Sequence, residues 1–123
     1  MIGHQDRSAN LEVKYADLSA NPYLLLVGMI AAGQDGVARG AVLGEEITGD
    51  PARFEESELT ARGIRRLPTS LTEAVEEFEG SPLLRDAYGD ALAEAIVAVR
   101  RGEVDRTAGL TPDQVAEAYR WVF

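Results

Sequence analysis

The chain has 123 residues, 46% of them hydrophobic and 27% charged, which is the composition of an ordinary globular domain. Its 21 acidic and 12 basic side chains give a formal net charge of −9, and an acidic surface repels nucleic acid and anionic membranes. The absence of cysteine excludes disulfides, thiolate zinc sites and a cysteine nucleophile. Composition therefore favours a single domain that binds neither nucleic acid nor membranes.

The first nine residues are small and polar and lack the apolar core of a secretory signal. The longest apolar stretch, at 23–32, is shorter than the about 20 residues needed to span a bilayer. We therefore expect a flexible N-terminal segment at 1–9, a folded remainder at 10–123 and a cytoplasmic location.

Residues 10–15 read Asn-Leu-Glu-Val-Lys-Tyr, and this polar and apolar alternation predicts a short, half-buried β-strand. Successive side chains of a strand point to opposite faces, so Asn10, Glu12 and Lys14 would share one face. A lone strand cannot pair its own backbone groups. The strand therefore needs neighbours that the rest of the sequence does not supply.

A helix should begin at Asn21-Pro22, because asparagine is a good N-cap and proline suits the first helical position. The residues after it are apolar on every side, so we expect other protein to enclose this helix, which can run on towards Arg39. No helical or strand period persists at 40–68, where glycine and proline recur. That stretch is expected to be irregular.

The remaining sequence predicts four further helices. Three have capped starts, at Ser70 with Glu73, at Ser81-Pro82 and at Thr111-Pro112. The other carries an apolar stripe at 92–99 and should end near Gly102. The fold class expected from these patterns is mainly α with one N-terminal β-strand.

The stretch at 10–36 reads Asn-Leu-Glu-Val-Lys-Tyr-Ala-Asp-Leu-Ser-Ala-Asn-Pro-Tyr-Leu-Leu-Leu-Val-Gly-Met-Ile-Ala-Ala-Gly-Gln-Asp-Gly. It resembles the late part of the glutamine synthetase catalytic domain, in which a strand bearing a glutamate and a basic residue runs into Ala-Asn-Pro-Tyr and a buried helix. A weaker likeness continues through Leu67-Pro68 to the Tyr-Arg-Trp-Val-Phe end. The resemblance implies that 10–123 is the C-terminal piece of an α+β glutamine synthetase-like catalytic domain.

This resemblance implies an ATP-dependent ligase that joins glutamate to ammonia or another amine, with Mg²⁺ or Mn²⁺ as cofactor. It places Glu12 at a metal-ligand glutamate of the family. Lys14 falls where many members have a catalytic arginine that neutralises the phosphoryl group or the substrate carboxylate, and a lysine there keeps the charge but loses the bidentate fork. Asn10 falls where many members carry another arginine, associated with the nucleotide.

Two alternatives remain open from the sequence. Without the resemblance, Glu12 and Lys14 would be interpreted as a solvated pair on an exposed strand. The whole chain is interpreted as a fragment of a longer ligase that is inactive alone, and the alternative is a short, non-catalytic helical interaction module derived from that family. We expect a homo-oligomer, and the residues seen here do not identify the amine.

Overall fold

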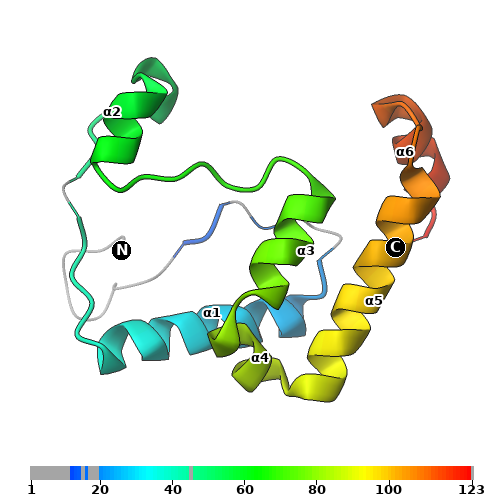
Figure 1. Cartoon of the computed structure of the whole chain (residues 1–123), viewed down its shortest axis with the longest axis horizontal. Coiled ribbons are helices and arrows are strands. Elements are labelled where there is room, and N and C mark those ends of the chain that lie inside the picture. The colour runs from blue at the N-terminus through cyan, green and yellow to red at the C-terminus, as the bar shows by residue number, and fades with distance from the viewer. Residues whose placement is uncertain (1–11, 15, 17–19, 45, 123) are drawn as a thin grey trace.

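The computed structural model describes residues 12–14, 16, 20–44 and 46–122. These residues form helices joined by turns and loops, so the mainly helical expectation is confirmed (Figure 1). The elements are α1 (Pro22–Ala38), the 3-10 turn η1 (Pro51–Arg53), α2 (Glu56–Ala61), α3 (Leu71–Glu79), α4 (Pro82–Tyr88), α5 (Asp90–Thr107) and α6 (Pro112–Tyr119).

The strand expected at 10–15 lies partly outside the described residues. Asn10, Leu11 and Tyr15 are not described, and residues 12–14 belong to no strand. The strand therefore stays a prediction, as does the flexible segment at 1–9, which also lies outside the described residues.

Helix α1 begins where the sequence predicts. The Asn21 side chain accepts hydrogen bonds from the backbone N–H groups of Tyr23 and Leu24, at 3.0 and 3.2 Å, and thereby satisfies two of the donors that the first turn leaves open. At the other end, Arg39 forms an ion pair with Asp35 one turn earlier. The Asn21 side chain thus defines the start of α1, and the chain turns away after the last turn at Gly40, whose φ is +62°.

The helices pack around α4 rather than around one large core. Figure 1 shows α1 lying across the base, with α4 against it and α3 and α5 rising beside each other. The described residues contain only two buried hydrophobic side chains, Val75 of α3 and Ala93 of α5, which are 6% and 4% exposed. A core this small contributes little hydrophobic stabilisation, and many large apolar side chains remain open to water.

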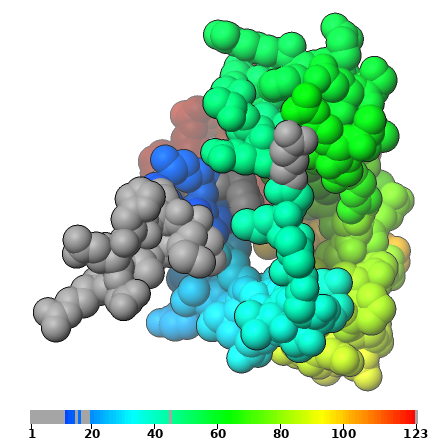
Figure 2. Space-filling view, turned by 90° about the vertical axis from the view of Figure 1, so that its left-hand side faces the viewer, coloured from blue at the N-terminus to red at the C-terminus, as the bar shows by residue number. Residues whose placement is uncertain are grey.

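The stretch at 40–68 is less irregular than expected, because it contains η1 and α2. Pro51 starts η1, and the Asp50 carboxylate accepts a 3.0 Å hydrogen bond from the Ala52 N–H. These elements are too short to give a periodic apolar pattern. Figure 2 shows the chain leaving α1 as a narrow column of atoms that leads towards α2.

The prediction that the longest helix ends near Gly102 is wrong, since α5 continues to Thr107. A glycine inside a helix costs only about 1 kcal/mol relative to alanine. Arg100 spans the glycine with an ion pair to Glu103, 2.6 Å from Nη1 to Oε2, which supports the helix on both sides of it. The turn comes instead at Gly109, whose φ of +79° suits glycine.

No helix in the described ranges is long and apolar enough to cross a membrane.

Candidate functional site

The structure brings Glu12 and Lys14 together, as expected for alternate residues on one face. Their Oε1 and Nζ atoms lie 3.5 Å apart, and the two side chains are 49% and 80% exposed. Val13, between them, is less exposed than either neighbour. An ion pair this open to water contributes about 0 to 1 kcal/mol to stability. In the chain alone, its geometry is that of a solvated pair.

A divalent cation does not fit the described residues alone. Mg²⁺ requires about six oxygen ligands in octahedral geometry, and Glu12 can supply at most two of them. Within the part of the chain that the structure describes, no three His, Asp or Glu side chains come close enough to hold a metal ion. A metal site that includes Glu12 would therefore need ligands from outside the described residues. Asn10 lies outside the described residues, so its nucleotide role stays untested.

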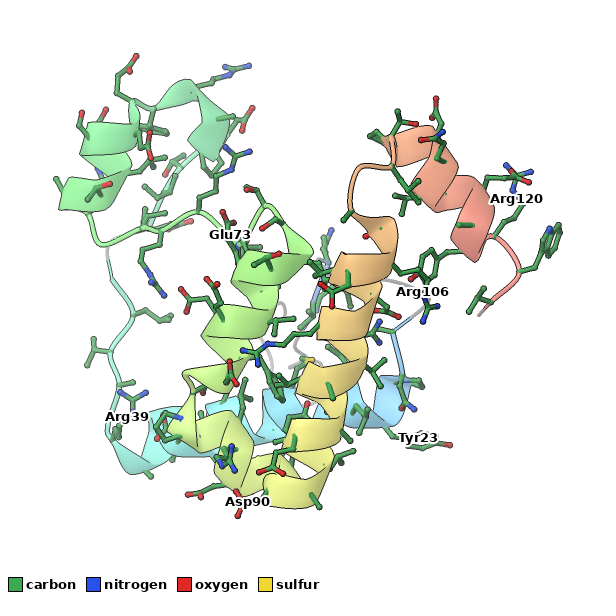
Figure 3. All side chains as sticks on the ribbon, turned by 45° about the vertical axis from the view of Figure 1, so that its right-hand side comes forward. Tyr23, Arg39, Glu73, Asp90, Arg106 and Arg120 are labelled. Atoms are coloured by element: carbon green, nitrogen blue, oxygen red, sulfur yellow. The ribbon has the colours of Figure 1, made fainter. Side chains whose placement is uncertain are left out.

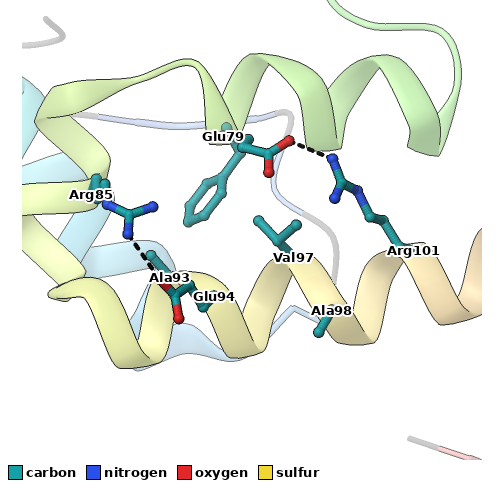
Figure 4. A pocket seen from close by; sticks show the side chains of 8 residues that line it. Glu79, Arg85, Ala93, Glu94, Val97, Ala98 and Arg101 are labelled. Atoms are coloured by element: carbon teal, nitrogen blue, oxygen red, sulfur yellow. Dashed lines mark hydrogen bonds and ion pairs between the residues drawn. The ribbon is translucent and has the colours of Figure 1, made fainter.

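A second candidate is a cavity of about 230 Å³ where α3, α4 and α5 meet (Figure 4). Phe78, Ala93 and Val97 form its apolar lining. Ion pairs bridge the helices beside it. The Arg101 guanidinium of α5 donates a 2.5 Å hydrogen bond to the Glu79 carboxylate of α3, and the Arg85 guanidinium of α4 donates one to the Glu94 carboxylate of α5.

The charges around this cavity are already paired. The Arg85 guanidinium donates to Glu94 at 2.9 Å and to Asp90 at 2.5 Å, and these hydrogen bonds raise the pKa of Arg85 above its ordinary value. Two carboxylates thus neutralise the cation that would otherwise attract an anionic substrate. The carboxylates in the lining, Glu79 and Glu94, are both held in ion pairs with arginines rather than left open to act as a nucleophile or a base. We interpret the cavity as a seam between helices rather than a catalytic site.

Sequence patterns could not have predicted the ion pairs that join the helices beside this cavity. Glu79 and Arg101 are 22 positions apart and lie on different helices, so no helical spacing links them. Glu12 and Lys14 were identified as candidates through the family resemblance, and the alternating pattern predicted only that they share one face.

Nearly the whole chain is similar to one family of known proteins. The family model described as glutamine synthetase, catalytic domain, matches residues 1–119. The gamma-glutamylpolyamine synthetase of Streptomyces coelicolor is 56% identical over 121 residues, which are 98% of this chain and 26% of that protein. The glutamine synthetase of Halobacterium salinarum is 38% identical over 96 residues, 78% of this chain and 21% of that protein.

A third relative, the glutamine synthetase of Mycolicibacterium smegmatis, is 36% identical over 100 residues, 81% of this chain and 22% of that protein. The chain therefore spans about a quarter of the length of these curated relatives.

Proposed function

This chain belongs to the glutamine synthetase family, and we propose that it forms the C-terminal part of the catalytic domain of a longer ATP-dependent ligase. That ligase joins the γ-carboxylate of glutamate to an amine. In balanced form, glutamate, the amine and ATP give the γ-glutamyl amide, ADP and phosphate. The observation that carries the proposal is the family match over 1–119 together with the high identity to a ligase across nearly the whole chain.

We assign a polyamine, rather than ammonia, as the amine. The basis is the difference in identity, 56% to a gamma-glutamylpolyamine synthetase against 38% and 36% to two glutamine synthetases. A polyamine is a flexible polycation, and the net charge of −9 favours its approach electrostatically.

Within the longer ligase, Glu12 is proposed as one ligand of a Mg²⁺ or Mn²⁺ ion, with the other ligands supplied from outside this chain. A divalent cation at such a site stabilises the charge of a transferred phosphoryl group. Lys14 is proposed to place its ammonium beside that group or the substrate carboxylate. The ion pair seen here holds both side chains close together, which suits that arrangement.

The isolated chain should be inactive, because one metal carboxylate without its partners cannot assemble a phosphoryl-transfer site. The test begins with the intact mass of the native gene product. A longer product should then be incubated with ATP, Mg²⁺ and glutamate, and with either spermidine or ammonia, while mass spectrometry follows the γ-glutamyl products. We expect γ-glutamylspermidine from the longer product and nothing from the 123-residue chain.

Three results would contradict this proposal. A native product with the mass of the 123-residue chain would support the non-catalytic helical module instead. A longer product that makes glutamine and no γ-glutamylspermidine would agree with the family assignment but contradict the proposal that the amine is a polyamine. Ligase activity of the isolated chain that disappears in Glu12→Gln would show that this segment is complete without its relatives' remaining sequence.

A further inference from the structure

The cavity between α3, α4 and α5 has an apolar floor and an ion pair at each end. Figure 4 shows the pair of Arg85 with Glu94 at one end and the pair of Glu79 with Arg101 at the other, and Val97 lies between them. Glu94 and Arg101 are seven residues apart on α5, which corresponds to about 10 Å along the helix axis. The cavity is therefore elongated, with charged groups at both ends.

The carboxylate at each end keeps one oxygen for a further donor. Arg85 donates to Oε1 of Glu94, and Arg101 donates to Oε2 of Glu79. Among the described residues, none donates a hydrogen bond to the second oxygen of either carboxylate. A carboxylate has about four acceptor positions, and the Glu94 and Glu79 side chains are 68% and 42% exposed. A cation from solvent can therefore reach both carboxylates.

The charges around the cavity favour a cation over an anion. Arg85 also donates to Asp90, which Figure 3 shows at the end of α5 that meets α4. Three carboxylates, those of Glu79, Asp90 and Glu94, thus bind two guanidinium groups, and the whole chain has a net charge of −9. The lining also includes the ring of Phe78, and the negative face of an aromatic ring attracts cations.

We propose that this cavity binds a linear polyamine, with the methylene chain on the apolar floor and an ammonium group at each carboxylate. The methylene chains of lysine and arginine lie along apolar surfaces in the same way, while their charged ends stay in water. A volume of about 230 Å³ is below the about 300 to 1,000 Å³ of pockets for drug-sized ligands, so a thin, unbranched molecule suits it. An inorganic cation would contact one end and leave the floor open to water.

This binding goes beyond the proposed function. The residues that line the cavity include neither Glu12 nor Lys14, and their charged groups are held in ion pairs. A polyamine bound here bridges α3 and α5 and is not the amine that the ligase transfers. Because the ligand binds only the folded chain, it raises the free energy of unfolding.

The test uses the 123-residue chain, since every residue that lines the cavity belongs to it. NMR follows the backbone amides while spermidine, putrescine, n-butylamine or Mg²⁺ is added at constant ionic strength. Putrescine is a shorter diamine, n-butylamine has the same methylene chain with one ammonium group, and Mg²⁺ has two charges without a chain. The variants are Glu94→Gln and Glu79→Gln, and Glu76→Gln, exposed on α3 and outside the lining, is the control for charge.

Spermidine should shift the amides around Glu79 and Glu94 in a saturable way. It should bind at least about tenfold more tightly than n-butylamine, because its second ammonium gains a charge-assisted hydrogen bond at the other end. Glu94→Gln and Glu79→Gln should each weaken spermidine binding by about fivefold, and Glu76→Gln should not. Equal weakening by Glu76→Gln, the same shifts with Mg²⁺, or no saturable shift with spermidine would overturn the proposal.

Val97→Phe tests the apolar floor while keeping every charge. Its larger ring fills the cavity, so spermidine should no longer shift the amides around Glu94. Circular dichroism shows whether the variant folds. Should it fail to fold, the series of amines on the unsubstituted chain decides the matter, because equal affinity for spermidine, putrescine and n-butylamine would refute binding at both ends.

The outcome does not depend on catalysis. A longer ligase that makes γ-glutamylspermidine, together with a 123-residue chain that does not bind spermidine, would overturn this inference alone. A longer ligase that makes only glutamine, together with saturable spermidine binding at this cavity, would overturn the polyamine substrate and support the binding site.

Discussion

Tyr88 donates a hydrogen bond of 2.5 Å from its hydroxyl to the backbone carbonyl of Leu24, across 64 positions of sequence. The bond joins the end of α4 to the early part of α1. In a helix the Leu24 carbonyl also accepts from the N–H four residues later, which belongs to Gly28. A Cβ on Gly28 would lie 3.0 Å from the Tyr88 hydroxyl oxygen, so the glycine makes room for this bond.

The first prediction concerns the hydroxyl alone. Tyr88→Phe should lower the free energy of unfolding by about 1 kcal/mol, the usual net value of an internal hydrogen bond. The loss should not be larger, because the Leu24 carbonyl keeps its helical partner and the ring keeps its contact with Phe78, 5.6 Å between centroids. Urea unfolding measures the change. An unchanged urea midpoint would mean that the hydrogen bond to Leu24 is no more favourable than the bond that the hydroxyl makes to water in the unfolded chain.

The second prediction is a coupling between Gly28 and Tyr88. Alanine is favoured over glycine inside a helix by up to about 1 kcal/mol, yet Gly28→Ala should not stabilise the chain, because its Cβ crowds the hydroxyl. In the Tyr88→Phe background that oxygen is gone, and the nearest remaining side chain, Leu84, is at an ordinary 3.7 Å. Gly28→Ala should then raise the free energy of unfolding.

Gly33→Ala is the matched control for this coupling. It lies on the same helix, and its added Cβ meets nothing within 4 Å, so alanine should stabilise the isolated chain equally in both backgrounds. A double-mutant cycle by urea unfolding gives the coupling energy. If Gly28→Ala has the same effect with and without the hydroxyl, crowding is not the reason for the glycine.

Sequence signals from neighbouring residues predicted where helices begin better than they predicted where helices end or where short elements lie. The starts of α1, α3, α4 and α6 follow from capping residues, whose effect depends on neighbours within a few positions. The predicted end of α5 was wrong because a single glycine inside a helix costs only about 1 kcal/mol, too little to end the helix at Gly102. The elements inside 40–68 were missed because they are too short to show a period.

The same limit applies to the candidate site. The pairing of Glu12 with Lys14 follows from alternation, which is local. The hydrogen bond from Tyr88 to the Leu24 carbonyl joins different helices, so no spacing in the sequence encodes it. The metal and phosphoryl roles of Glu12 and Lys14 derive from family resemblance and stay predictions, because the described residues do not include the partners that these roles require.

The third prediction is a pH effect at the start of α3. Ser70 caps the helix as expected, accepting from the Glu73 N–H at 3.2 Å. The Glu73 carboxylate, however, bonds mainly to Thr69, accepting from its backbone N–H at 2.8 Å and from its hydroxyl at 3.2 Å. These bonds, the backbone one foremost, lower the pKa of Glu73 below its ordinary value of 4.5.

A lowered pKa means that the folded chain binds the Glu73 proton less readily than the unfolded chain does. The stabilisation is therefore complete above the ordinary value of 4.5 and disappears as the pH falls through the lower pKa of the folded carboxyl. Glu73→Gln should lower the free energy of unfolding at pH 7, and that free energy should then fall less steeply as the pH is lowered. Glu76→Gln, at an exposed position of α3, is the control for charge. Equal effects of the two variants in unfolding curves from pH 7 to about pH 3 would contradict this role of Glu73.

The fourth prediction separates the two interpretations of Glu12. In the isolated chain, Glu12→Gln should change the free energy of unfolding by less than about 1 kcal/mol, because it removes only an exposed ion pair. In the intact ligase, the same change removes a negative charge proposed to bind the cation. Turnover should then fall on the order of 100-fold, the scale of losing one electrostatic group at a reacting centre. Activity should also require more Mg²⁺.

Lys14 provides the matched comparison, since it forms the other half of the pair. Lys14→Ala should lower turnover in the intact ligase, and Lys14→Arg should retain more of it, because arginine keeps the cation that the proposed role needs. Neither change should shift the Mg²⁺ requirement as Glu12→Gln does, since a cation is not a metal ligand. Steady-state kinetics across a Mg²⁺ titration distinguish these outcomes. Near-normal turnover of Glu12→Gln at saturating Mg²⁺ would contradict the proposed metal role. Glu12 and Lys14 would then be a solvated surface pair, and other residues of the ligase would hold the metal.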